Sequence, residues 1–324
     1  MKKIIVITTG GTIAMKYDKE VNGLIPAVNG NDLVEVVPEL KNIAKIDVIE
    51  FSNVPSGHMT PKMMFELAHL VDEYANNNDV FGIVITHGTD TLEETAYMLN
   101  LLIKTKKPVC ITGAMRGASD VGADGPANIL ASVRVACCDK AKEKGVLVVF
   151  NDEIHAANEV TKTHTTSCAT FKSFEWGPIG HVYFDKIIFV RQPLNLEKIQ
   201  PDKLIDNVYL LKIYAGMNAD LFKYLAEKNI NGLVVEAFGC GNVTPGVKEG
   251  IEYVRQKNIP VVLTTRVFSG RVAPLYSYLG SIKSMENFGI ILSEGLSGQK
   301  SRIKLMLALG VTKDINKLKQ IFNN

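Results

Sequence analysis

Short, continuous runs of valine and isoleucine recur along this chain, and segments with helical patterns separate them. Such runs are typical of strands in a parallel sheet that helices cover on both faces. Because strands and helices alternate, we predict an α/β fold whose sheet is mostly parallel and flanked by helices. The runs in the first half of the chain are "KIIVIT" (3–8), "FGIVIT" (81–86), "KPVCIT" (107–112) and "GVLVVF" (145–150).

The segments between these runs have the features of helices. Residues 60–77 begin with Thr60 and Pro61, a suitable N-cap and first helical residue, and carry apolar side chains at helical spacing. Residues 91–105 carry one apolar stripe, and residues 124–140 begin with Asp-Gly-Pro, which favours the start of a helix.

The alternating pattern is interrupted at residues 191–207, which contain two prolines and lack periodicity. Strand and helix patterns then resume and continue to the C-terminal region. A length of 324 residues also favours about two domains. We therefore predict an N-terminal catalytic α/β domain at 1–190, a linker at 191–207 and a smaller C-terminal α/β domain at 208–324.

Charge and cysteine usage argue against several classes of protein. A formal net charge of +2 provides no field that would attract nucleic acid or an anionic membrane. No apolar run approaches the roughly 18 residues that a membrane span needs, and residues 4–7 are too short for the apolar region of a signal peptide. The five cysteines form no CxxC pair, and the histidines lack i, i+4 metal spacing. We expect a cytoplasmic protein with no metal, no organic cofactor, no nucleic-acid partner and no membrane anchor.

Hydroxyl groups follow two of the predicted strands. The first strand ends in Gly10-Gly11-Thr12, and the strand at 81–86 leads into "THGTDT", where Thr89 lies beside Asp90. The carboxyl ends of parallel strands meet at one edge of a sheet, where open α/β sheets bind ligands. Glycines there allow unusual backbone angles and a close approach of substrate. The spacing matches neither a dinucleotide-binding loop nor a P-loop.

Structural explanations for these residues remain open at this point. The two glycines could simply form a turn that Thr12 caps, and the residues of "TDT" could cap the following helix. A third polar segment, 159–180, contains Lys162 between threonines. A partly buried lysine can accept a proton from a hydroxyl group, although most lysines are solvated surface charges. His87 could be a general base, but its neighbours favour a structural residue at the end of a strand.

Taken together, these segments resemble the bacterial-type L-asparaginase family, which includes the glutaminase-asparaginases. The resemblance continues to "QKSRIKLMLAL" and covers essentially the whole chain. Its motifs occur in the family's order and are "TTGGTIA", "ITHGTDTLEETAYML", "GAMRGASDVGADGPANI" and "EVTKTHTTSCATFKSFEWGPIG".

The resemblance implies conversion of L-asparagine to L-aspartate and ammonia, with L-glutamine as a poorer substrate. Thr12 would be the nucleophile and would form an acyl-enzyme that water cleaves. A threonine hydroxyl needs a base, and the resemblance implies a proton relay of Thr89, Lys162 and Asp90. Backbone donors near Thr89 and Ala114 would stabilise the oxyanion.

The resemblance also implies how substrate is held. Asp90 would bind the α-ammonium group and Ser56 the α-carboxylate, and Thr89 and Ala114 would also line the substrate site. Gly57 stands where the family usually has Gln or Glu, which leaves the preference between asparagine and glutamine open. Tyr17 would be the lid tyrosine, in a segment that we expect to be a mobile flap because it contains Gly23, Pro26 and Gly30.

Self-association follows from the same resemblance. Asn242, in "FGCGNVTPG", would help to complete the site of a neighbouring subunit, whereas Ser277 or Tyr278 stands where the family has an acidic partner. We therefore expect a homodimer or homotetramer. The alternatives are a dual glutaminase-asparaginase, an amidase of shifted specificity, a non-catalytic amino-acid sensor on the same fold and, least favoured, the amidohydrolase subunit of a tRNA-dependent amidotransferase.

Overall fold

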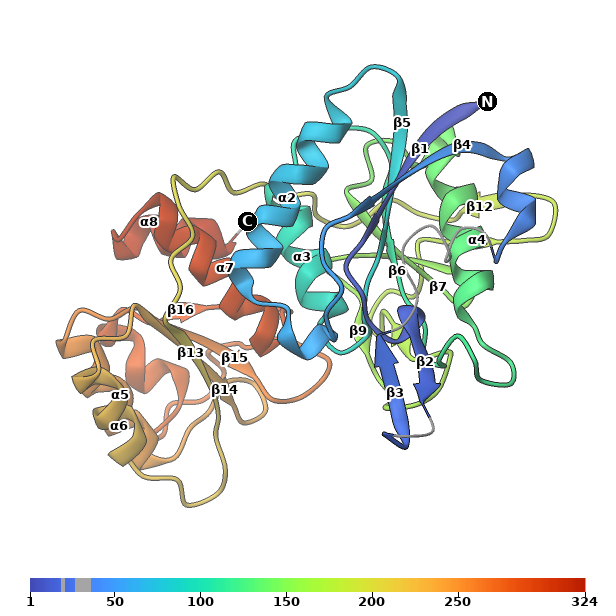
Figure 1. The fold of residues 1–324 in the computed structure, drawn as a ribbon. Coiled ribbons are helices and arrows are strands. Elements are labelled where there is room, and N and C mark those ends of the chain that lie inside the picture. Colours follow the sequence, from blue (N-terminus) through green and yellow to red (C-terminus); the bar gives the residue numbers. More distant parts are fainter. Residues whose placement is uncertain (19–20, 27–35, 324) are drawn as a thin grey trace. The chain divides into compact units, whose positions relative to one another are not determined.

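The computed structural model describes residues 1–18, 21–26 and 36–323. Contacts divide the chain into two compact units, residues 1–198 and 199–324, and the predicted linker at 191–207 spans the boundary between them. Each unit has its own main sheet and its own hydrophobic core. The predicted combination of a larger and a smaller α/β unit is therefore confirmed (Figure 1).

The first unit is built on an eight-stranded sheet with the order β12-β11-β8-β7-β6-β5-β1-β4. From β4 to β7 all neighbours are parallel, as predicted, whereas β8, β11 and β12 continue the sheet in antiparallel pairs. The strands are β1 (Lys2–Thr8), β4 (Ala44–Glu50), β5 (Val80–Thr86), β6 (Val109–Thr112), β7 (Val146–Phe150), β8 (Glu153–Ala156), β11 (Gly180–Val182) and β12 (Ile187–Phe189).

Helices cover both faces of this sheet (Figure 1). α2 (Pro61–Ala75) and α3 (Leu92–Leu102) contact each other and the sheet, and α4 (Gly125–Ala136) packs on β5, β6 and β7 from the other face. α2 begins where the sequence predicts, since the Thr60 hydroxyl accepts a hydrogen bond of 3.2 Å from the Met63 amide. Such a cap stabilises a helix by about 1 kcal/mol.

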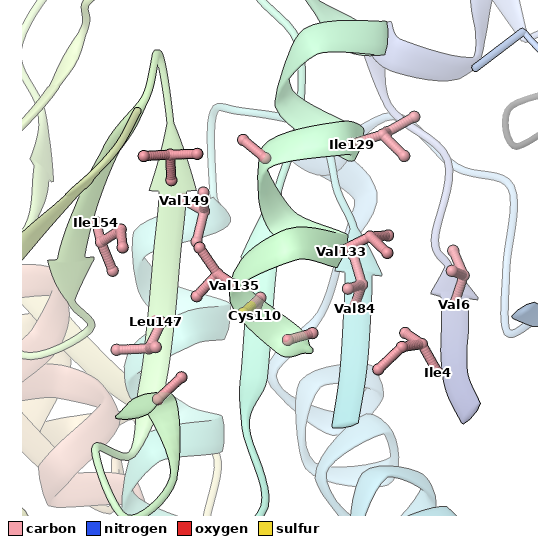
Figure 2. Packing of buried hydrophobic residues seen from close by; sticks show 14 of the residues in the cluster. Ile4, Val6, Val84, Cys110, Ile129, Val133, Val135, Leu147, Val149 and Ile154 are labelled. Carbon is pink, nitrogen blue, oxygen red and sulfur yellow. The ribbon is translucent and has the colours of Figure 1, made fainter. Parts of the chain in front are cut away.

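The core beneath α4 consists of fully buried aliphatic side chains. Figure 2 shows Val133 and Val135 of this helix lying over Val6, Val84 and Leu147 of three different strands. Burial of one such side chain contributes roughly 1.5–3 kcal/mol. The strand ends that carry the polar segments are therefore held by a tightly packed layer.

The order of the parallel strands defines one special position in the sheet. The chain passes from β1 to β4 on one side of β1 and then returns to β5 on the other side. In doubly wound sheets, ligands bind outside the carboxyl ends of the strands where this direction reverses. That position lies between β1 and β5, the two strands that precede Thr12 and Thr89.

Two small hairpins stand apart from the main sheet. β2 (Met15–Asp18) pairs antiparallel with β3 (Gly23–Pro26), directly after the short 3-10 turn at Thr12–Ala14. β9 (Thr161–Lys162) pairs antiparallel with β10 (Phe171–Lys172). The second hairpin places Lys162 in a strand of defined register.

The second unit has a four-stranded parallel sheet in sequence order. Within the described part of the chain, no helix is both long and apolar enough to cross a membrane. The strands are β13 (Val208–Lys212), β14 (Gly232–Ala237), β15 (Val261–Thr265) and β16 (Ile291–Leu292), and the helices are α5 (Asp220–Glu227), α6 (Pro245–Gln256), α7 (Gly298–Val311) and α8 (Ile315–Asn323).

Candidate active site

Two glycines allow the end of β1 to lie directly against neighbouring loops. Gly10 and Gly11 have φ angles of 98° and 85°, a region that side chains disfavour. A Cβ atom added at Gly11 would lie 2.3 Å from the Gly88 Cα, and one at Gly10 would lie 2.4 Å from the Val54 nitrogen. Thr12 follows at once and is half-buried. The glycine pair therefore brings the loop of Thr12 against the loop that contains Thr89.

Lys162 connects the two polar side chains at the end of β5. Its Nζ donates hydrogen bonds to Thr89 Oγ1 at 2.9 Å and to Asp90 Oδ1 at 2.7 Å. The Lys162 side chain is only 16% exposed, whereas that of Asp90 is 73% exposed. Lys162 is thus not the solvated surface charge that its sequence context left open. The exposed Asp90 carboxylate has surface left for a ligand.

The structure also answers the helix-capping alternative. Thr91 is the N-cap residue of α3, but its side chain makes no capping hydrogen bond to the helix. Its hydroxyl donates instead to the Ser56 carbonyl at 2.8 Å. Since the side chains of Thr89 and Asp90 contact Lys162, the polar cluster "TDT" forms cross-element contacts rather than a helix cap.

Ser56 lies against this loop from the 3-10 turn Ser56–His58. Its Oγ accepts a hydrogen bond of 3.1 Å from the Asp90 amide, so its own hydroxyl hydrogen can be donated to another acceptor. A Cβ at Gly88 would lie 2.8 Å from Ser56 Oγ, which shows how closely the loops approach. Gly57 is exposed, and a Cβ added there would have no neighbour within 4 Å.

Ala114 follows β6 on the other side of Thr89. It is buried, with 1% of its surface exposed. A Cβ at Gly125, the first residue of α4, would lie 3.4 Å from the Ala114 Cβ and 3.0 Å from Ile13 Cγ1. Ile13, directly after Thr12, and Ala114, two residues after β6, therefore both lie against the start of α4.

His87 has a structural position beneath the site. Its Nδ1 donates to the Gly88 carbonyl at 2.7 Å, and its Nε2 lies 3.0 Å from the Thr95 hydroxyl. Full burial lowers the pKa of His87 to about 4. The ring is therefore neutral near pH 7, and its Nε2 accepts from the Thr95 hydroxyl. The ring therefore fixes the loop before Thr89 rather than facing solvent as a general base, in agreement with the sequence interpretation.

The burial of His87 predicts a loss of stability in mild acid. The unfolded chain binds a proton near pH 6.5, whereas the folded chain does so only near pH 4. Because the unfolded state binds more protons between these values, the titration of His87 should by itself lower the free energy of unfolding by about 3 kcal/mol as pH drops from about 6.5 to 4. Urea denaturation at a series of pH values measures this change.

A pair of variants identifies the group responsible for that acid sensitivity. His87→Asn should remove much of the slope, and a second variant, His155→Asn, should remove a further part of it. Burial also lowers the pKa of His155 to about 4, so part of the slope remains in His87→Asn. An unfolding free energy that stays constant from pH 6.5 to 4 would contradict the prediction.

The two units match two parts of one known enzyme. Residues 3–195 match the protein-family model for asparaginase, N-terminal, and residues 207–322 match that for the glutaminase/asparaginase C-terminal domain. This chain belongs to the asparaginase family. It is similar to L-asparaginase 2 of Bacillus subtilis, with 36% identity over 100% of this chain and 86% of that protein. Similarity to the probable periplasmic L-asparaginase of Haemophilus influenzae is 34% identity over 100% and 93% of the two chains.

A solved asparaginase structure has the same fold. The probable cytoplasmic L-asparaginase of Campylobacter jejuni superposes with a TM-score of 0.89 and 33% identity, over 100% of both chains. The resemblance predicted from the sequence motifs is therefore confirmed over the full length of this asparaginase-family chain.

The contacts described above do not bear on two of the predicted site residues, Tyr17 and Asn242. Tyr17 is in β2, but its side chain, like residue Gly30 of the expected flap, lies outside the described residues. Asn242 belongs to the second unit, where its backbone N–H donates to the Phe238 carbonyl at 2.9 Å in a tight turn. The roles that the asparaginase family implies for Tyr17 and Asn242 stay predictions.

Two residues of the motif "ADGPAN", Asp124 and Asn128, are polar neighbours of the site. The sequence analysis interprets this motif only as the start of a helix. Asp124 and Asn128 both bind backbone groups of the segment after β6. Two polar residues four apart at the start of a helix were the available signal. Among the described residues of this asparaginase-family chain, no group of three or more His, Cys, Asp and Glu side chains could hold a metal ion.

Proposed function

We propose that this chain is an L-asparaginase, which hydrolyses the side-chain amide of L-asparagine to L-aspartate and ammonia. The observation that carries the proposal is the contact of Lys162 with both Thr89 and Asp90. It lies beside the close approach of Gly11 to Gly88, which brings the loop of Thr12 to the same place. The relatives described as L-asparaginases support the same substrate.

In the proposed reaction, the Thr12 hydroxyl attacks the amide carbonyl carbon of the substrate. The C–N bond breaks, ammonia leaves with a proton, and an ester links Thr12 to the aspartyl group. Water then cleaves the ester and regenerates the hydroxyl. The proton that Thr12 loses passes through Thr89 to the neutral amine of Lys162 and from there to the leaving nitrogen. In the second step the same groups take a proton from the attacking water and return one to the Thr12 oxygen, since a threonine hydroxyl or a water molecule is a poor nucleophile without a base. Asp90 pairs with the Lys162 amine while it is protonated.

The proposed substrate contacts follow from exposure and donor direction. Asp90 offers a largely exposed carboxylate for the α-ammonium group. Ser56 offers a hydroxyl hydrogen for the α-carboxylate, because its oxygen already accepts from the Asp90 amide. Backbone groups near Thr89 and Ala114 are candidates for stabilising the oxyanion, each typically contributing ~3 kcal/mol.

The experiment that tests the proposal is ammonia release from L-asparagine, L-glutamine and other amides. Release from L-asparagine above all others is expected. Equal release from L-glutamine would favour the dual glutaminase-asparaginase. Binding of L-asparagine without ammonia release would favour the amino-acid sensor, and activity only on a charged tRNA would favour the amidotransferase subunit.

The open space at Gly57 leads to a prediction about substrate affinity. Gly57→Gln should lower the KM for L-asparagine about fivefold, because a side-chain amide there could accept a hydrogen bond from the α-ammonium group. The added side chain has room, since a Cβ at this position meets nothing within 4 Å. Steady-state kinetics on L-asparagine and L-glutamine measure the effect. Gly57→Ala is the control, and an equal change in both variants would contradict the prediction.

We also infer that the enzyme self-associates as a homodimer or homotetramer, with Asn242 reaching a neighbouring site. Large apolar side chains are exposed on each unit, among them Trp176 and Phe184 on the first and Tyr276 and Tyr278 on the second. Exposed groups of this kind are common at interfaces. Light scattering should give two or four times the chain mass of 35.5 kDa. A mass of one chain would contradict the inference.

A cytoplasmic location is proposed as well. The Campylobacter jejuni relative is described as probably cytoplasmic, whereas the Haemophilus influenzae relative is described as periplasmic. Cell fractionation followed by ammonia release from L-asparagine would distinguish the two compartments.

A further inference from the structure

The segment Gly113–Arg116 connects β6 to the loop before α4 and lies against the loop of Thr89. A Cβ added at Gly113 would lie 2.3 Å from the His87 carbonyl oxygen and 3.5 Å from Thr89 Cγ2. The backbone of this segment therefore runs within van der Waals contact of the polar cluster. The directions of its N–H and C=O groups decide which of them can face a substrate held there.

Two side chains from the start of α4 bind this segment from behind. Asp124 Oδ1 accepts hydrogen bonds from the Arg116 amide at 2.9 Å and from the Met115 amide at 3.1 Å. Asn128 Nδ2 donates to the Gly113 carbonyl at 3.0 Å, and its Oδ1 accepts from the Asn151 amide at 2.9 Å. Both carboxylate oxygens of Asp124 are used, since Oδ2 accepts from Met115 and from Asn128.

These contacts determine the orientation of two successive peptide groups. In a trans peptide the carbonyl and the N–H point in opposite directions. Because Asn128 binds the Gly113 carbonyl, the Ala114 N–H must point away from Asn128. Because Asp124 binds the Met115 N–H, the Ala114 carbonyl must point away from Asp124. The backbone N–H and the backbone carbonyl of Ala114 are thus both oriented by side chains, those of Asn128 in α4 and of Asp124 directly before it.

We propose that Asp124 and Asn128 are positioning residues that orient the peptide groups on either side of Ala114 toward the reacting amide. This proposal rests on the proposed function, since it concerns the same site. The Asn128 side chain is itself held, because only 3% of the residue's surface is exposed and its Oδ1 accepts from the Asn151 amide at 2.9 Å. A rotation of the oriented peptide groups would weaken interactions made in the transition state more than those made with the bound amino acid.

The test compares Asp124→Ala, Asp124→Asn and Asn128→Ala with the control Ser132→Ala. The control removes a buried hydrogen bond of the same helix that contacts neither Gly113 nor Arg116. Asp124→Ala and Asn128→Ala should lower kcat for L-asparagine ~10- to 100-fold with KM nearly unchanged. Asp124→Asn keeps an acceptor for the two amides and should recover much of the loss. Ser132→Ala should lower Tm but leave kcat within about twofold.

Two further readouts separate positioning from loss of structure. Thermal unfolding gives the folded fraction by which each kcat is divided, and calorimetry with L-aspartate should give unchanged product binding. Hydrogen exchange at the Met115 and Arg116 amides should accelerate in Asp124→Ala and not in Ser132→Ala. Wild-type kcat per folded enzyme in Asp124→Ala and Asn128→Ala, or an equal loss in Ser132→Ala, would overturn the inference.

Failure of the proposed function gives a different pattern. If the wild-type protein released no ammonia from any amide, the assigned reaction would be wrong. Hydrogen exchange would then still report on the orientation of the segment. Unchanged exchange at Met115 and Arg116 in Asp124→Ala would overturn the positioning role by itself.

Discussion

Replacing Thr12 with alanine is expected to lower kcat for ammonia release from L-asparagine about ten-thousand-fold or more. The variant lacks the oxygen that would form the acyl-enzyme, and removal of a covalent nucleophile leaves only the contribution of binding and of the oxyanion donors. Folding should be retained, because Thr12 is half-buried and the change creates no large cavity. A coupled ammonia assay at saturating L-asparagine measures the effect.

The control for this experiment keeps the hydroxyl. Thr12→Ser should retain a substantial part of the activity, while Thr12→Ala should still bind L-aspartate with nearly wild-type affinity through the Asp90 and Ser56 side of the site. Wild-type ammonia release by Thr12→Ala would exclude this residue as the nucleophile. Inactive wild-type protein that binds L-asparagine as tightly as Thr12→Ala would support the sensor.

Replacing Lys162 with methionine is expected to lower kcat ~100- to 10,000-fold, the usual range for loss of a group that transfers protons. Methionine keeps the unbranched shape but not the contacts to Thr89 at 2.9 Å and Asp90 at 2.7 Å. Stability should change little, because the Asp90 side chain is 73% exposed and can be solvated without its partner. Kinetics and thermal unfolding of the same preparation separate the two effects.

The neighbouring strand of the hairpin offers a matched control. Lys172 pairs with Glu153 at 2.7 Å, so Lys172→Met removes a lysine from β10 without touching Thr89. Its kcat should stay close to that of the wild type. The pair Thr89→Val and Lys162→Met should be strongly non-additive if the two side chains act as one relay. Additive losses, or equal losses in both lysine variants, would contradict the relay.

Local chemistry explains which parts of this fold the sequence predicts well. Continuous apolar runs predict the parallel strands because both faces of the sheet are covered, and Thr60 with Pro61 predicts the start of α2 because the cap is local. The antiparallel strands β8, β11 and β12 are short, at most four residues, and have no comparable pattern. β7–β8 and β11–β12 are local hairpins, whereas the pairing of β8 with β11 joins Ile154 to Gly180 across the intervening β9–β10 hairpin.

The residues of the candidate site likewise differ in how well the sequence predicts them. Gly11 and Thr12 follow the first strand, so their place at the sheet edge follows from topology alone. Lys162 lies 73 residues from Thr89 in the sequence, and only the β9–β10 hairpin brings its amine into contact. From the residues alone, Lys162 was more typical of a surface charge, and the family resemblance was needed to select it. Asn128 binds the backbone carbonyl of Gly113, and its four-residue spacing from Asp124 is too common at the start of a helix to predict such a contact.

The contact between Gly11 and Gly88 has a consequence for protein engineering. Main-chain atoms there set the spacing of the loops that carry Thr12 and Thr89. A Cβ added at Gly11 would lie 2.3 Å from the Gly88 Cα, and one added at Gly88 would lie 3.0 Å from the Gly11 Cα, so either methyl group would push the loops apart. Libraries that aim to change amide selectivity should therefore leave these two codons untouched. They can vary position 57, where an added Cβ would meet no atom within 4 Å.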